Sequence, residues 1–239
     1  MKPSIQPPRR KTLVRLAALG VTGALGPAGI MGLIQEALAN GDKPIAVGIN
    51  SLQGSATING VVAKIGMLVK PGDTVATGSA KGSYAVVVIG RDAYLLREGT
   101  SVTFEGNKEQ AGTVSKVLIA TGKILSVFAK RPAESRLNIS AQTATIGIRG
   151  TGCYIEIHDK RTYFCLCYGE ATVDGSGMEK SKIIKATHHD SPVWLDESGG
   201  YMKIEGTNFG SHTDEELIML EKLTGREPPF VALGLTGRY

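Results

Sequence analysis

Residues 143–173 read TATIGIRGTGCYIEIHDKRTYFCLCYGEATV, and this stretch decides the fold class. Apolar and polar residues alternate on both sides of the polar group HDKR at 158–161, as expected of two strands that each bury one face. The corner IRGTG at 148–152 precedes the first strand, and its glycines, Gly150 and Gly152, are expected to adopt positive φ where the chain turns. We therefore predict a β-hairpin that is entered through a glycine-containing corner.

The predicted hairpin has a register that follows from its turn. If Asp159 and Lys160 form a two-residue turn, Glu156 lies opposite Tyr163. The same register then pairs the residues further from the turn on both strands. Because side chains alternate between the two faces of a strand, this register fixes which residues are buried together. A slip of one residue would turn the whole apolar set outward.

All three cysteines of the chain lie in this hairpin. The register places Cys153 opposite Leu166 on the apolar face, whereas Cys165 and Cys167 point to the other face. A bridge from Cys153 to either partner would need a register slip. A bridge between Cys165 and Cys167 is strained, because alternate residues of a strand lie ~6.6 Å apart, near the limit for a disulfide. We interpret Cys153 as a small buried hydrophobe.

Outside the hairpin the chain is poor in aromatic residues and rich in glycine, valine, isoleucine and threonine, which is typical of strands and turns. An Asn-Gly pair at 59–60 is a strong hairpin signal. The sequence predicts an all-β fold, an antiparallel sandwich or roll of many short strands. Further strands are expected at Ile45–Ile49, Ala56–Ile58, Val61–Ile65, Thr74–Ala76, Tyr84–Ile89, Ala93–Leu96, Ser101–Phe104, Val114–Ala120, Ile124–Phe128, Ser181–Ala186, Val193–Leu195 and Tyr201–Ile204.

One short C-terminal α-helix is expected within residues 206–239. Thr213 and Glu216 have the spacing of a capping box, and Gly225 is suited to end the helix. Three leucines at 217, 220 and 223 form a narrow apolar stripe that should dock on the β domain. The remaining residues are expected to form an extended tail whose Phe230 fills a surface groove.

Residues 1–39 have the features of an export signal peptide, with a signal helix. Arg9 and Arg10 resemble a twin-arginine signal, an uncharged stretch follows, and Ala37 and Ala39 are the small residues that a signal peptidase requires. The alternative is an uncleaved membrane anchor, but five glycines between residues 16 and 34 lower its apolarity and helix propensity. We expect cleavage after Ala39 and a location in the periplasm or outside the cell.

The net charge does not indicate a nucleic-acid partner. The formal charge is +5, and the first 39 residues contribute five basic side chains against one acidic one. The mature chain would therefore carry about +1, and its basic residues occur in runs no longer than two. We expect no nucleic acid as a partner, and contact with a membrane only through an uncleaved signal.

From about residue 70 to residue 173 the chain resembles the FecR-type periplasmic domain family. The resemblance rests on PGDTVATG at 71–78, on the alternating Tyr84, Val86 and Val88, on AYLLREGT at 93–100, and on IRGT at 148–151 followed by a return strand ending at Gly169. It implies that residues 40–205 form an extracytoplasmic, non-enzymatic β domain that binds a protein or envelope component, with signalling as a role known in the family. The regulators of sigma factors in this family need a cytoplasmic domain before the export signal, so we expect a secreted module instead.

The corner of the hairpin is a candidate binding site made of Arg149, Gly150 and Thr151. Arg149 is either a structural donor that holds loop carbonyls or a cation that faces a ligand, and the structural role is favoured. Its guanidinium has several donors in a fixed geometry, which suits an irregular loop. We therefore expect this corner to be structural first.

A second candidate site combines Cys165 and Cys167 with His188 and His189, and His212 lies further along the chain. Two thiolates and one or two imidazoles suit Zn²⁺ or another soft metal ion. Twin-arginine export carries folded proteins, which is compatible with metal uptake before export. The more ordinary interpretation is a pair of partly buried thiols beneath the C-terminal helix and surface histidines in a turn, with no cofactor. A thiol redox sensor at the same residues stays open.

An enzyme is not expected. A cysteine nucleophile with His189 and Asp190 is the one catalytic arrangement that the residues offer, and it lacks a recognisable activating environment. The sequence contains no nucleophile elbow, paired carboxylate motif or zincin helix. The leading prediction is an exported non-enzymatic binding module, and the alternative is a metal-binding or redox-sensing protein.

Overall fold

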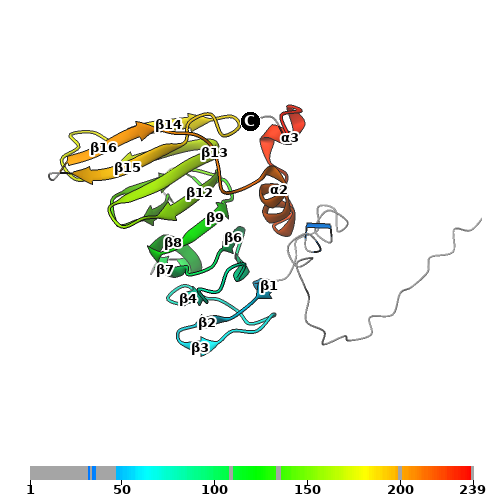
Figure 1. The fold of residues 1–239 in the computed structure, drawn as a ribbon. Helices are drawn as coiled ribbons and strands as arrows, with labels where there is room; N and C mark the ends of the chain where they lie inside the picture. Colours follow the sequence, from blue (N-terminus) through cyan, green and yellow to red (C-terminus); the bar gives the residue numbers. More distant parts are fainter. Residues whose placement is uncertain are drawn as a thin grey trace, which may run out of the picture.

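The computed structural model describes residues 47–107, 110–132, 136–198 and 201–237, together with Gly32, Ile34 and Gln35. Within these residues strands far outweigh helices, which confirms the predicted all-β class (Figure 1). The residues of the predicted export signal, Arg9, Arg10, Ala37 and Ala39, lie outside the described ranges. No helix in the described part of the chain is long and apolar enough to cross a membrane.

The strands follow the expected succession along the chain except for β10 (Leu137–Ser140), which the sequence did not predict, and β3 (Val61–Val62), which is shorter than the predicted Val61–Ile65. Their bounds are β1 Gly48–Gln53, β2 Ala56–Ile58, β3 Val61–Val62, β4 Thr74–Thr77, β5 Tyr84–Ile89, β6 Asp92–Leu96, β7 Ser101–Asn107, β8 Gln110–Thr121, β9 Lys123–Val127, β10 Leu137–Ser140, β11 Thr145–Ile148, β12 Gly152–Ile157, β13 Arg161–Asp174, β14 Lys182–Ala186, β15 Val193–Ser198 and β16 Tyr201–Gly206. Most of them are short, as predicted, but β8 and β13 have 12 and 14 residues.

The strands form one curled sheet with two walls. One wall contains β1, β5, β6, β9, β12, β15 and β16, and the other contains β2–β4, β7, β8, β10, β11 and β14. The long strand β13 joins the walls, because its first part pairs with β12 and β15 and its last part with β11 and β14. All these pairs are antiparallel except β8 with β10, which is parallel and makes the sheet mixed.

The hairpin of β12 and β13 has the predicted register. Glu156 pairs with Tyr163 and Cys153 with Leu166, and the backbone N–H of His158 donates to the carbonyl of Arg161 across the two-residue turn. The prediction that the return strand ends at Gly169 was wrong. Gly169 has φ +97°, and there the strand changes walls and continues to Asp174.

The two glycines of the corner have different physical roles. Gly150 has φ +80°, as expected, and a Cβ there would lie 2.7 Å from Cα of Lys130. Gly152 does not have positive φ, which corrects the expectation for this residue. It is required because a Cβ would lie 2.4 Å from the ring of Tyr168 on the neighbouring strand. Only glycine permits both the turn and this close approach.

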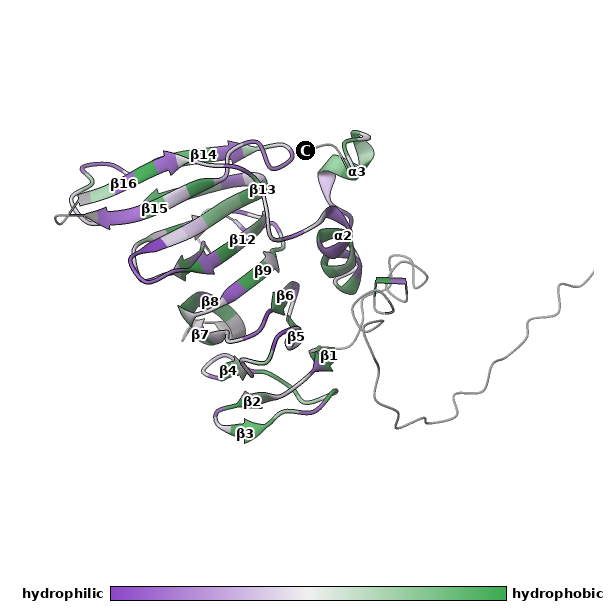
Figure 2. Cartoon of the chain, in the orientation of Figure 1, coloured by the Kyte–Doolittle hydropathy of each residue, from purple (hydrophilic) through white to green (hydrophobic). Residues whose placement is uncertain are grey.

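Buried apolar side chains form two clusters on opposite faces of the wall that contains β12. Hydrophobic and hydrophilic residues alternate along several strands of the sheet (Figure 2). We call the first of the two clusters the intersheet cluster, because it lies between the walls; it includes Tyr94, Phe104 and Cys153. We call the second the helix-side cluster, because it lies between the wall and the C-terminal helix; it includes Cys165 and Cys167. Ile34, from the predicted signal segment, is buried against the helix-side cluster.

The C-terminal helix α2 covers the helix-side cluster beside β6 and β9 (Figure 1). It spans Asp214–Leu223 and begins with the predicted capping box of Thr213 and Glu216. Gly225 follows the helix with φ +71°. The carboxylate of Glu216 also accepts two hydrogen bonds from the guanidinium of Arg97, at 2.8 and 2.9 Å, which fixes the start of the helix to the end of β6.

The chain after α2 differs from the predicted extended tail. Pro229–Ala232 form a short helix, α3, and Phe230 within it is completely buried in the helix-side cluster. Proline at the start of a helix is favoured, because its fixed φ suits the first turn and its missing N–H has no partner to lose. The prediction was that Phe230 fills a surface groove; its side chain instead belongs to the buried helix-side cluster, and the backbone around it is helical.

Candidate metal centre

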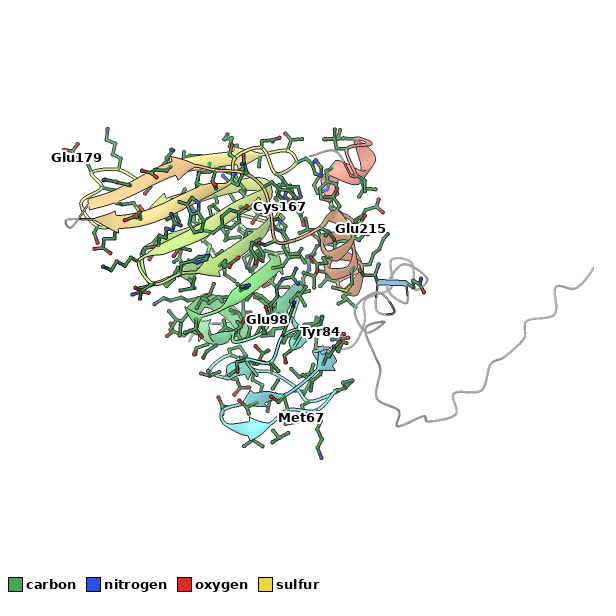
Figure 3. All side chains as sticks on the ribbon, in the orientation of Figure 1. Met67, Tyr84, Glu98, Cys167, Glu179 and Glu215 are labelled. Carbon is green, nitrogen blue, oxygen red and sulfur yellow. The ribbon has the colours of Figure 1, made fainter. Side chains whose placement is uncertain are left out.

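Four side chains from three separate segments meet beneath the N-terminal end of α2. They are Cys165 and Cys167 of β13, His189 of the turn after β14, and His212 just before the helix. One ligand atom from each lies within 4.8 Å of the corresponding atom of the other three, and all four residues are buried. Figure 3 labels Cys167 on the part of the sheet that faces α2. Two thiols and two imidazoles are a donor set that suits Zn²⁺ and other soft metal ions.

The strand β13 places both thiols because alternate residues point to the same face. Between its pairing with β15, which ends at Phe164, and its pairing with β14, which begins at Gly169, this edge of β13 pairs with no strand of the described residues. The turn that contains His189 fills the gap, since its backbone N–H donates to the carbonyl of Cys167 at 2.9 Å. His189 has φ +53°, and this backbone brings its ring over the thiols.

Hydrogen bonds outside the cluster determine which nitrogen of each imidazole carries the hydrogen. Nε2 of His189 lies 3.1 Å from a carboxylate oxygen of Asp214, and Nδ1 of His212 lies 2.9 Å from the carbonyl of Gly210. Both of these oxygens only accept, so each outer nitrogen carries the hydrogen. In the neutral rings the inner nitrogens, Nδ1 of His189 and Nε2 of His212, therefore present lone pairs to each other. A carboxylate behind a histidine is also a common arrangement around bound metal ions.

Three of the six distances between the ligand atoms can be compared with those of a tetrahedral metal site, and all three match it. Typical Zn–S and Zn–N bonds give edges of about 3.3 Å between two nitrogens, about 3.5 Å between sulfur and nitrogen, and about 3.8 Å between two sulfurs. The two inner nitrogens are 3.2 Å apart. Sγ of Cys165 is 3.5 Å from Nδ1 of His189, and Sγ of Cys167 is 3.3 Å from Nε2 of His212. Along these three edges the cluster has the spacing that a bound ion requires.

Aromatic rings enclose the cluster and keep it dry. The ring of Tyr154 stacks on His212 with centroids 4.6 Å apart, and Phe209 and Phe230 pack against His189. Both thiols are completely buried, and each of the two imidazoles is at most 6% exposed. The expectation of surface histidines in a turn was therefore wrong, because the turn is folded inward against β13.

The two thiols have opposite acidities. The hydrogen bond from Cys167 lowers the pKa of Cys165 to about 4, although burial opposes this shift. Burial raises the pKa of Cys167 well above its usual value, as the neighbouring sulfur of Cys165 also does. In the protein without a cation, one thiolate is therefore stabilised by one thiol. A bound metal ion would favour the thiolate form of both.

The remaining residues of the predicted metal set lie next to this cluster. His188 does not direct a nitrogen to the thiols, because its Nε2 lies 2.9 and 3.0 Å from the two carboxylate oxygens of Asp214. Its place in the four-atom group is taken by His212. Asp190, considered as a partner for a catalytic cysteine, instead accepts hydrogen bonds from the backbone N–H groups of Thr187 and His188 and so shapes the turn.

Asp214 is the residue of the site that the sequence did not indicate. It is completely buried and accepts from His188, His189 and the backbone N–H of Gly237, which is 2.7 Å away. Burial alone would raise the pKa of this carboxyl, but these donors outweigh burial and hold the pKa below its usual value. The sequence signal was the acidic residue directly after Thr213, which predicted only a favourable interaction with the helix dipole.

The other candidate site, at Arg149, Gly150 and Thr151, has the features of a structural corner. Arg149 is exposed and makes no hydrogen bond or ion pair with the described residues, so it does not hold the loop. The corner is instead fixed by the backbone of Gly150 and by a hydrogen bond from the N–H of Phe128 to the carbonyl of Thr151. Thr151 itself is completely buried.

Comparisons with known proteins identify no family for this chain. No protein-family model matches the chain, and no curated protein matches it. Two solved structures, each of "a putative anti-sigma factor" from Parabacteroides distasonis, are similar at 12% identity and a TM-score of 0.44. The matches cover 56% and 63% of this chain and 60% and 74% of those chains. At this level of similarity no partner or role transfers to this chain, and its likeness to the FecR family stays a prediction.

Proposed function

We propose that this chain is an exported, non-enzymatic β-domain protein that binds one soft metal ion, Zn²⁺ in the first place, at Cys165, Cys167, His189 and His212. The single observation that carries this proposal is the convergence of two buried thiols and two buried imidazoles, whose ligand atoms lie within 4.8 Å of one another. The export and the location outside the cytosol rest on the sequence alone.

The orientation of the two imidazoles supports a cation at the centre. Their inner nitrogens are 3.2 Å apart, and their outer nitrogens are committed to Asp214 and to the carbonyl of Gly210. Each inner nitrogen also faces a sulfur atom, with Nδ1 of His189 3.5 Å from Sγ of Cys165 and Nε2 of His212 3.3 Å from Sγ of Cys167. The four atoms therefore point towards a common centre. A metal ion satisfies all four donors together.

The burial of the thiols favours a binding role over catalysis. Cys165, His189 and Asp214 form a chain of contacts similar to a nucleophile, a base and an orienting acid. However, Cys165 has no exposed surface, so a substrate could not reach its sulfur in this conformation. A closed set of four protein ligands is typical of structural metal sites, whereas catalytic sites keep an open position.

The experiment is elemental analysis of the full chain, purified under reducing conditions without a histidine tag and then exposed to Zn²⁺. We expect one equivalent of zinc, and reconstitution with Co²⁺ should give the absorption of tetrahedral thiolate coordination. The paired change Cys165→Ser and Cys167→Ser should abolish binding, and Cys153→Ala is the matched control that retains it. Absence of stoichiometric zinc in folded wild-type protein would exclude the proposed function.

The other predicted function, binding of a protein or envelope component, stays a prediction. It is compatible with a metal site that has a structural purpose, because such a site stabilises a fold and leaves the surface available. A redox role for the two thiols also remains compatible with the geometry. It would require that oxidation be observed at Cys165 or Cys167 after metal removal.

A further inference from the structure

We propose that the bound metal ion fastens the C-terminal segment, residues 207–237, to the helix-side face of the sheet, so that loss of the ion loosens this segment. The inference rests on the proposed function and assigns the metal site a regulatory consequence. Three of the four ligands, Cys165, Cys167 and His189, belong to the sheet and its turn. The fourth, His212, belongs to the C-terminal segment.

The segment is connected to the cluster at more than one point. Asp214, the first residue of α2, contacts Nε2 of His189 at 3.1 Å on the sheet side. The same carboxylate accepts the backbone N–H of Gly237 at 2.7 Å, near the end of the described chain. A metal ion on Nδ1 of His189 would fix the orientation of this ring. It would therefore hold His212 directly, and Asp214 and Gly237 through His189.

Other contacts of the segment do not depend on the cluster. Glu216 pairs with Arg97, and Glu221 accepts from Tyr168 and from Nε of Arg226. The buried leucines of α2 pack on the wall in either state. We therefore expect α2 to stay on the sheet after metal loss, while the ends of the segment, residues 207–214 and 229–237, become mobile.

The part before the helix is the most sensitive, because its burial depends on His212. Between Asn208 and Thr213 the chain contributes two rings to the site, Phe209 and His212, which pack against each other and against His189. Loss of the ion removes the bond that would join His212 to the three ligands on the sheet, and His212 is then held by its contacts with Cys167 and His189 and by ring packing. An outward movement of His212 then becomes easier. That movement would expose the ring of Tyr154, which His212 now covers, and open a path to the two thiols.

The test is hydrogen exchange followed by mass spectrometry on the full chain, with zinc bound and after removal of zinc by a chelator, and with metal content measured in both samples. We expect amides in 207–214 to exchange about tenfold faster after metal removal, with β5 and β6 unchanged. A maleimide should react with Cys165 or Cys167 only in the chelated sample.

A variant separates this effect from metal binding itself. His212→Gln removes the ligand that the segment contributes and leaves three ligands on the sheet, so residues 207–214 should exchange fast even with excess zinc. His158→Gln is the matched control, because His158 is an exposed histidine in the turn of the hairpin. If the wild type binds one equivalent of zinc, loses it to the chelator, and exchanges equally fast in both states, the ion does not fasten residues 207–237. The proposed metal site would then stand without this consequence. Absence of zinc binding would overturn both.

Discussion

The two clusters on either side of the β12–β13 wall use the same residue types for different purposes. In the intersheet cluster Cys153 is surrounded by apolar side chains, and burial raises the pKa of its thiol. In the helix-side cluster Cys165 and Cys167 face two imidazoles. The difference arises because strands cover the first face, whereas a turn and a helix start cover the second. Ends of elements bring polar groups that need partners, so the covering element decides the chemistry of a buried face.

The largest effects are expected from two buried aromatic rings, one in each cluster. Phe104→Ala in the intersheet cluster and Phe230→Ala in the helix-side cluster should each lower the free energy of unfolding by about 3–5 kcal/mol. Only Phe230→Ala should also weaken zinc binding, because its ring packs against His188 and His189. Urea denaturation and zinc competition with a chromophoric chelator measure the two quantities. Equal zinc affinity in both variants would show that the rings around the site do not support it.

The second prediction concerns the dependence of stability on metal. At free zinc a hundredfold above the dissociation constant, a bound ion stabilises the fold by about 2.7 kcal/mol. Wild type and Cys153→Ala should show this gain over their chelated forms, and the paired change Cys165→Ser and Cys167→Ser should not. Thermal unfolding with and without chelator checks the prediction. A gain in the doubly changed protein would place the metal elsewhere and remove the contrast between the two faces.

The sequence predicted the contrast between the faces because it depends on local alternation. With a two-residue turn at Asp159 and Lys160, a period of two is sufficient to separate Cys153 from Cys165 and Cys167. The capping box at Thr213 was predictable for the same reason, since it involves residues three apart. Each of these features is set by neighbours in the chain.

The closure of the site was not predictable in this way. His212 and Cys167 are 45 residues apart, and their contact depends on how β13 crosses between the walls and how the C-terminal segment returns. The pattern favoured His188 as a ligand because it is adjacent to His189, but neighbouring residues in the turn direct their rings differently. Asp214 had a sufficient local explanation as a helix-start residue, which concealed its role behind His189.

A smaller effect is expected at the start of α2. Thr213→Ala removes the side chain that accepts the backbone N–H of Glu216, and such a change typically costs about 1 kcal/mol. Thr213→Ser is the matched control, because serine retains the hydroxyl. The loss in Thr213→Ala should be seen in chemical denaturation. If Thr213→Ser were equally destabilised, the hydroxyl that caps α2 would not be the group that stabilises the helix on the helix-side cluster.

The smallest effect concerns the buried carboxyl at the other end of α2. Glu221 is 3% exposed and accepts from the hydroxyl of Tyr168 and from Nε of Arg226. Burial raises the pKa of Glu221 above its usual value, although the guanidinium of Arg226 opposes this. A carboxyl whose pKa is raised in the folded state stabilises the fold below its ordinary pKa, and this contribution is lost as the pH rises through the raised value.

Wild type should therefore lose stability relative to Glu221→Gln as the pH rises from below the ordinary glutamate pKa, and the difference should become constant above the raised pKa. Urea denaturation over this range measures it, with chelator in both samples so that proton release by metal binding does not contribute. Glu170→Gln is the control, because Glu170 forms only a surface pair with Lys185. The prediction would be contradicted if wild type gained stability relative to Glu221→Gln as the pH rises, or if their relative stability did not change with pH. On the helix-side face the buried carboxylate of Glu221 would then be fully compensated by Tyr168 and Arg226, which contrasts with the buried thiols, for which we propose a metal ion as the partner.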